Sequence, residues 1–258
     1  MSTTLRSALT GLFDDAGLFP PARRPMAAAL MAHDRARQGP HGAFMGPFLC
    51  PVARLEELDA CVAAGRPRPD EIGVVAYPND LWVKRAVSQP GVVHIEAPLD
   101  MPLPGEAGRV RRYLELPPQC DVNVAVDAVV RARGFAKLRC GGVTPDAVPS
   151  VDRVAHALAA CAGRGVSLKA TAGLHHPFPR HDAATGAIQH GFVNLLAAAS
   201  SAVAGATLEE LAEILSLRED DGDAVVARVD RRARELVVAI GTCSIDEPVD
   251  ALEDLGVL

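Results

Sequence analysis

Two lysines stand inside apolar, strand-like runs of the sequence. Lys169 lies within GVSLKATAGLHHPF, and Lys137 lies within FAKLRC. A charged side chain is costly to bury unless it is paired, so a lysine in such a run belongs to an ion pair or takes part in chemistry. An amine that has lost its proton attacks carbonyl compounds and forms a Schiff base. The alternative interpretation is a buried ion network in which Glu96 or Asp127 pairs with Lys137.

Short apolar runs alternate with amphipathic segments along the whole sequence, a pattern typical of parallel strands joined by helices. We predict strands at residues 11–16, 43–49, 72–77, 92–97, 121–127, 135–140, 166–172 and 236–243. We predict helices at residues 24–37, 52–64, 79–88, 105–115, 150–163, 190–203 and 248–255. Eight strand–helix units in about 250 residues are the size of a closed (βα)8 barrel, the TIM barrel. An open doubly wound sheet is less favoured, because the chain has neither a GxGxxG motif nor a P-loop.

We expect a single TIM-barrel domain over residues 1–258, since 49% of the residues are hydrophobic and suffice for one large core. The segment 173–235, before the eighth predicted strand, is about twice as long as such a connection requires. Long connections in enzymes are often lids. We therefore predict a lid-like insertion at this point of the barrel.

Polar residues of four predicted strands share one parity, and apolar residues share the other. Alternate side chains of a barrel strand point into the lumen. The residues expected there are His94, Glu96, Asn123, Asp127, Lys137, Arg139, Lys169 and Thr171. A lumen filled only for stability would hold Val, Ile and Leu, so these residues predict an active site. The predicted catalytic residues are Glu96, Asp127, Lys137 and Lys169, and the predicted substrate contacts include Asn123, Arg139 and Thr171.

The two lysines fall on neighbouring predicted strands, which lie about 4.8 Å apart in a sheet. Two like charges in a partly dry pocket lower each other's pKa. Moving a lysine pKa from about 10.4 to about 7 costs roughly 4–5 kcal/mol, which burial and a second cation can supply. We therefore expect one of the two amines to be uncharged at neutral pH, with Glu96 or Asp127 moving the protons.

Three motifs lie on the last predicted strands: FAKLRCGGVTP, then LKATAG with its lysine 32 residues after the first, and finally IGTCS. Over about a third of the chain they resemble strands six to eight of the class I, Schiff-base deoxyribose-phosphate aldolases. The resemblance implies that Lys137 forms the imine and that Lys169 lowers its pKa. The anion-binding residues that it implies are Gly173, Thr242 and Ser244. Arg139 departs from that family's pattern, and it can pair with a carboxylate instead of a phosphate.

Four histidines, His175, His176, His181 and His190, fall within the insertion. We predict His175 and His176 as substrate contacts. With Glu96 they would also suit a metal-dependent lyase or hydrolase. Their spacing matches neither HxH nor HExxH, so we expect no metal and no cofactor. The cysteines at the strand ends, Cys140 and Cys243, lack a base on the same strand, so thiol catalysis is not expected.

Composition favours a small-molecule substrate. The formal net charge is −6, whereas nucleic acids and anionic membranes select for clustered Lys and Arg. Scattered cysteines, no apolar leader and no run of 18 apolar residues favour a cytoplasmic protein. The sequence is compatible with a homo-oligomer. We predict a class I, aldolase-like lyase; the alternatives are the metal-dependent enzyme and a barrel that binds a phosphate or another anion without a Schiff base.

Overall fold

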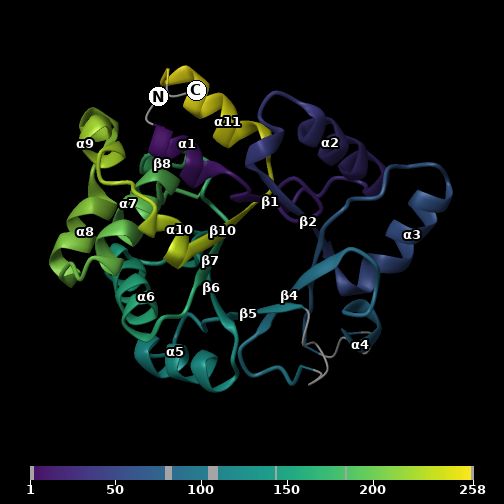
Figure 1. The fold of residues 1–258 in the computed structure, drawn as a ribbon, viewed down its shortest axis with the longest axis horizontal. Coiled ribbons are helices and arrows are strands. Elements are labelled where there is room, and N and C mark those ends of the chain that lie inside the picture. The colour runs from purple at the N-terminus through teal and green to yellow at the C-terminus, as the bar shows by residue number, and fades with distance from the viewer. Residues whose placement is uncertain (1–2, 79–82, 104–109, 143, 184, 257–258) are drawn as a thin grey trace.

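The computed structural model describes residues 3–78, 83–103, 110–142, 144–183 and 185–256. Eight parallel strands close into a barrel in the order β1-β10-β7-β6-β5-β4-β3-β2, and helices surround it (Figure 1). The predicted TIM-barrel fold is confirmed. None of the described helices is long and apolar enough to cross a membrane.

Seven of the eight predicted strands overlap strands of the barrel. The barrel strands are β1 (Phe13–Asp15), β2 (Met45–Pro51), β3 (Ile72–Val75), β4 (Val92–Pro98), β5 (Arg111–Glu115), β6 (Phe135–Arg139), β7 (Leu168–Thr171) and β10 (Val237–Thr242). β6 and β7 are hydrogen-bonded neighbours in which Lys137 and Lys169 are register partners. The alignment of the two lysines across adjacent strands is therefore as predicted.

The described helices lie before, between and after these strands. They are α1 (Thr3–Leu9), α2 (Met26–Gln38), α3 (Leu55–Ala63), α4 (Val83–Ala86), α5 (Val122–Arg131), α6 (Val151–Arg164), α7 (Phe192–Val203), α8 (Leu208–Ser216), α9 (Gly222–Val226), α10 (Arg232–Leu236) and α11 (Asp246–Asp254). α6 begins at the predicted cap, where the Ser150 side chain accepts a hydrogen bond from the Arg153 amide at 3.2 Å. It ends at Gly165, whose φ of 64° is the left-handed conformation that glycine adopts easily. Of the helix predicted at 79–88, residues 79–82 lie outside the described part of the chain.

The strand predicted at 121–127 is wrong, because this segment forms helix α5. The Asp121 side chain caps it by accepting a hydrogen bond from the Val124 amide at 3.0 Å. The buried residues Val122, Ala125, Val126 and Val129 follow a helical spacing. Alternating valines also fit a strand, but the cap and this buried face favour the helix. The fifth strand is β5, within the segment predicted as a helix at 105–115, of which residues 105–109 are not described.

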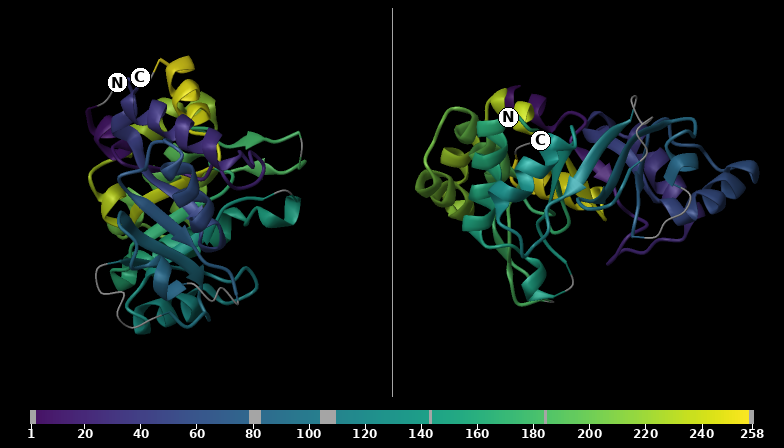
Figure 2. Two further views of the ribbon diagram at one scale, coloured as in Figure 1. Left: turned by 90° about the vertical axis from the view of Figure 1, so that its right-hand side faces the viewer. Right: turned by 90° about the horizontal axis from the view of Figure 1, so that it is seen from below.

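The segment predicted as a lid-like insertion, 173–235, contains a short hairpin and four α-helices among its described residues. A hairpin of β8 (Arg180–His181) and β9 (Ile188–Gln189) projects from the body of the barrel (Figure 2). The following helix α7 is buried, and Phe192 at its start packs edge-on against Phe13 of β1 with ring centroids 5.4 Å apart. α7 thus serves as a core helix of the barrel, and α8 packs against it and against α6.

Candidate active site

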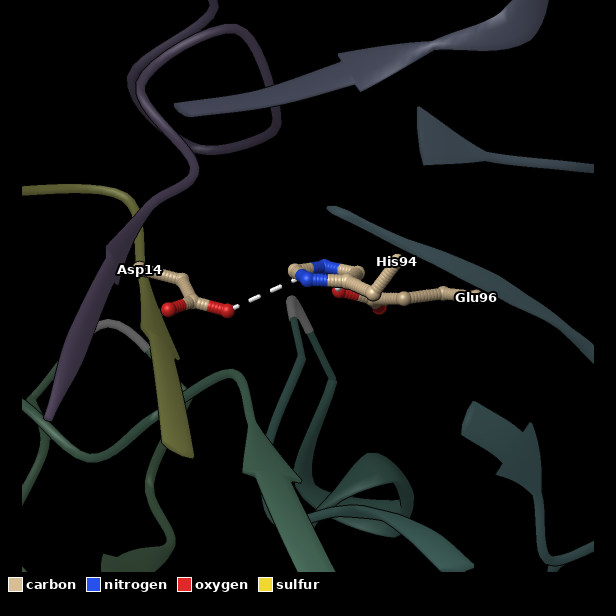
Figure 3. Close-up of side chains that lie close together, drawn as sticks. All are labelled: Asp14, His94 and Glu96. Carbon is tan, nitrogen blue, oxygen red and sulfur yellow. Dashed lines mark ion pairs between the residues drawn. The ribbon is translucent and has the colours of Figure 1, made fainter. Parts of the chain in front are cut away.

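A layer of ionisable side chains, which we call the charged layer, fills the lumen of the barrel. Asp14 comes from β1, His94 and Glu96 from β4, Lys137 from β6 and Lys169 from β7, and all five are buried. Figure 3 shows Asp14 facing His94 across the lumen, with Glu96 beside the histidine ring. The predicted parity of β4, β6 and β7 is therefore confirmed at these positions.

Lys169 lies at the centre of this layer and is fully buried. Its ammonium group pairs with the carboxylate of Asp14 and lies 2.5 Å from Glu96 Oε1. The same nitrogen lies 3.4 Å from His94 Nε2 and 5.3 Å from the centroid of the Tyr113 ring. Two carboxylates, an imidazole nitrogen and an aromatic face therefore surround one cation, which replaces the hydration that the ammonium group loses on burial.

Lys137 lies on the other side of Glu96. Its nitrogen is 2.8 Å from Glu96 Oε2 and 3.0 Å from Glu115 Oε2 of β5. The two oxygens of Glu96 thus contact different lysines. Glu96 separates the two ammonium groups electrostatically, because its negative charge lies between them.

The pKa directions correct the expectation that one amine is uncharged. Burial alone would lower the pKa of Lys137, but the carboxylates of Glu96 and Glu115 outweigh it and raise the pKa. In Lys169, burial is likewise outweighed by Asp14 and Glu96, and the pKa is raised. Burial would raise the pKa of Glu96, yet the two lysines hold it well below its usual value. Both amines are therefore charged at neutral pH, because the carboxylates that contact each amine raise its pKa.

Two glycines make room for this layer. A Cβ atom at Gly46 of β2 would lie 2.2 Å from Asp14 Oδ1. A Cβ atom at Gly73 of β3 would lie 2.0 Å from His94 Nε2. Any larger residue at either position would overlap the charged layer, so small residues on β2 and β3 are part of the site.

A cavity of about 540 Å³ opens at the carboxyl ends of the strands, above Lys169. One wall is mainly apolar and includes Phe19, Pro21, Leu49, Val75 and Tyr77. The opposite wall is polar and includes Glu96, Glu115, Lys137, Arg139, His175 and Asp182. Of the two lumen lysines, Lys137 lines the cavity, whereas Lys169 is fully buried and does not line it.

Most of the predicted site residues on β6 and β7 reach this cavity. Arg139, Thr171, Gly173 and His175 line it together with Glu96 and Lys137. His176, Thr242 and Ser244 do not line it, and the Thr242 hydroxyl instead donates to the Ser244 carbonyl at 2.7 Å.

Asn123 and Asp127 are not lumen residues, which corrects the prediction. Both are exposed on α5, outside the barrel, where they contact the Arg164 guanidinium at 3.2 and 2.6 Å. The actual fifth strand is β5. Its residues Tyr113 and Glu115 occupy the lumen positions that are predicted for Asn123 and Asp127. A signal for this was present in the sequence, since Asp121 is a good helix cap and RRYLEL alternates as a strand does.

Comparison of the chain with protein-family models, curated proteins and solved structures finds no match.

Ligand atoms of Asp14, His94 and Glu96 all lie within 4.8 Å of one another, a spacing that would suit a metal ion. The Lys169 ammonium group contacts all three residues, so a cation already lies among these donors. Within the described ranges, the histidines of the insertion form no second group of this kind. The donor set thus fits a buried ion network better than a metal site.

Proposed function

We propose that the protein is a class I, aldolase-like lyase in which Lys137 forms a Schiff base with a small carbonyl substrate. The observation that carries the proposal is the position of Lys137, between two carboxylates and at the wall of a cavity. A buried ion pair with no chemical role needs no such access. The resemblance to the Schiff-base aldolases, which assigns the imine to the same lysine, adds support.

Because Lys137 is protonated at rest, the reaction starts with a proton transfer. Glu96 is a weak base, since Lys169 and Lys137 stabilise its ionised form. Glu115 contacts Lys137 at 3.0 Å and is partly exposed, so it is the better proton acceptor. The freed amine then attacks the substrate carbonyl carbon, and the proton on Glu115 returns as the carbinolamine loses water. The resulting iminium accepts the electron pair of the carbon–carbon bond that breaks.

Lys169 acts as a positioning residue in this scheme. It holds Glu96 ionised and in place, and Glu96 in turn orients the Lys137 nitrogen. Its proposed role therefore differs from the one the resemblance implies, because Lys169 acts on Lys137 through a carboxylate. A lysine without access to the cavity has no direct contact with the substrate.

Arg139 favours a carboxylate on the substrate. Its side chain lines the cavity two positions beyond Lys137, on the same face of β6. Its Nε donates to the Gly141 carbonyl at 2.9 Å, and no described carboxylate forms an ion pair with it. A phosphate near Ser244 would meet Asp246 and Glu247, which occupy the first turn of α11. We therefore propose an oxo acid or a similar carbonyl compound with one carboxylate.

Borohydride trapping tests the proposal. The chain has only three lysines, and the third, Lys84, is exposed on α4 and serves as an internal control. Pyruvate, glyoxylate and acetaldehyde are incubated separately with the protein, reduced with borohydride and located by peptide mass spectrometry. We expect the two oxo acids to label Lys137 in preference to Lys84. Equal labelling of the two lysines by every probe, or undiminished labelling after Lys137→Arg, would refute it.

A further inference from the structure

Three side chains at the cavity rim form a second cluster, apart from the charged layer of the lumen. Cys243 directly follows β10, His175 lies in the loop after β7, and Glu247 lies in the first turn of α11. The Cys243 sulfur is 3.7 Å from His175 Nε2, and His175 Nδ1 is 2.8 Å from Glu247 Oε2. The thiol and the imidazole both line the 540 Å³ cavity. The thiol, the imidazole and the carboxylate therefore follow one another in a row, and a ligand in the cavity can reach the first two.

The hydrogen bonds decide what the imidazole can do. When Nδ1 carries the proton and donates it to Glu247, Nε2 is left with a lone pair that faces the thiol. Glu247 is held by its own backbone amide, which donates to the Ser244 hydroxyl at 3.4 Å. The loop between β10 and α11 thus supplies both the sulfur and the carboxylate, and His175 is held between them.

The other cysteines lack this arrangement. Cys50, Cys140 and Cys161 are buried, and burial raises the pKa of each thiol to about 12. No described histidine forms a hydrogen bond with any of the other five sulfurs. Burial raises the pKa of Cys243 as well, and Glu247 adds to the rise. Its thiol is therefore neutral at rest, and it needs a base at the moment of attack.

We propose that Cys243 is a nucleophile for acyl transfer, with His175 as its general base and Glu247 as the residue that positions the imidazole. The substrate class is a small activated acyl compound, an ester or a thioester, whose acyl group fits the cavity. This arrangement of groups is the one that acyl-transfer enzymes use on unrelated folds. The proposal does not depend on the Schiff-base chemistry of Lys137.

The reaction proceeds in two balanced steps. The sulfur attacks the acyl carbon as the thiol proton moves to His175 Nε2; the bond to the leaving oxygen or sulfur breaks, and His175 gives that atom the proton. Water then attacks the S-acyl carbon, its proton passes through His175 to the Cys243 sulfur, and a carboxylic acid is released. The net reaction is hydrolysis of the ester or thioester, with no change in oxidation state.

Acylation by p-nitrophenyl acetate tests this proposal. We expect a burst of p-nitrophenolate and one acetyl group on Cys243, located by peptide mass spectrometry. His175→Asn removes the base and should slow acylation of Cys243 by at least about 100-fold, the usual range of general-base catalysis. Glu247→Gln should cost less, because this carboxylate is half exposed and screened by water.

Matched controls separate reactivity from folding. Cys61→Ser removes a half-buried thiol of α3, and His156→Asn removes an exposed histidine of α6; neither should alter the burst. A comparison within the wild-type protein needs no variant: Cys243 should be acetylated before Cys61 and Cys120, although it is more buried than either. Earlier labelling of Cys61 or Cys120, or an unchanged burst in a folded His175→Asn variant, would overturn the proposal.

Discussion

Replacing Lys169 by methionine tests whether the lumen layer is held together by its buried cation. Lys169 is fully buried and contacts Asp14 and Glu96. After the substitution Glu96 still has Lys137, but Asp14 loses its only described lysine or arginine partner. Asp14 Oδ1 already lacks a hydrogen-bond partner among the described residues. One carboxylate is therefore left buried and unpaired, which costs about 3–5 kcal/mol.

This loss is large against a total stability of about 5–15 kcal/mol for a folded domain. Urea unfolding at pH 7, followed by far-ultraviolet circular dichroism, measures it. Lys84→Met is the matched control, because Lys84 is exposed on α4, and a surface change of this kind stays within about 0.5 kcal/mol. The double variant Asp14→Asn/Lys169→Met removes the unpaired charge and should recover part of the loss.

The destabilisation should also shrink as the pH falls. In the wild type the two lysines lower the pKa of Glu96, so its contribution to stability is present above its usual pKa of 4.5 and is lost as the pH falls through the lowered pKa. In the variant one of these lysines is absent, so acidification removes a smaller stabilising contribution of Glu96 than it does in the wild type. Wild type and variant should thus be closer in stability at pH 3 than at pH 7. A difference below about 1 kcal/mol at pH 7, or one independent of pH, would refute the ion-network account.

Three further changes test other parts of the site. Glu115→Gln removes a carboxylate that raises the pKa of Lys137. The pH profile of borohydride trapping should therefore move to lower pH, and the maximum rate of trapping should fall. An unmoved profile would exclude Glu115 as the proton acceptor of Lys137. Gly73→Ala places a methyl group 2.0 Å from His94 Nε2 and should destabilise the protein by about 1–3 kcal/mol in urea unfolding; unchanged stability would mean that the lumen can relax. Asp127→Asn alters an exposed residue of α5 and should leave the rate of trapping at Lys137 unchanged, whereas a lost adduct would connect this helix to the site.

On β4, β6 and β7 the sequence predicts the inward-facing side chains correctly. Parity alone points His94, Glu96, Lys137 and Lys169 inward, because side chains alternate across any strand. The same argument fails for Asn123 and Asp127, because their segment is the helix α5, whose buried face is Val122, Ala125, Val126 and Val129, while Val124 is exposed. Glu115 is absent from the predicted lumen for the converse reason, because it lies on β5, within the segment predicted as a helix at 105–115.

The charge state of the lysines depends on distances across the barrel, which parity does not provide. Lys137 and Lys169 are register partners, as predicted, yet Glu96 contacts both amines, at 2.8 and 2.5 Å. Asp14, 155 residues before Lys169, enters the site only because β1 closes the barrel against β10. The number of lysines is a further indication of the site in the sequence, because the chain has only three and two of them lie in the lumen.

The pairing of Glu96 with both amines has an electrical consequence. Lys137 and Lys169 bring two positive charges against three negative ones on Asp14, Glu96 and Glu115, while burial lowers the pKa of His94 and leaves it neutral. If Lys137 lost its proton to bulk solvent, the set would hold one more uncompensated negative charge in a poorly polarisable interior. Transfer of that proton to Glu115, which lies 3.0 Å from the Lys137 nitrogen, would leave the total charge of the cluster unchanged.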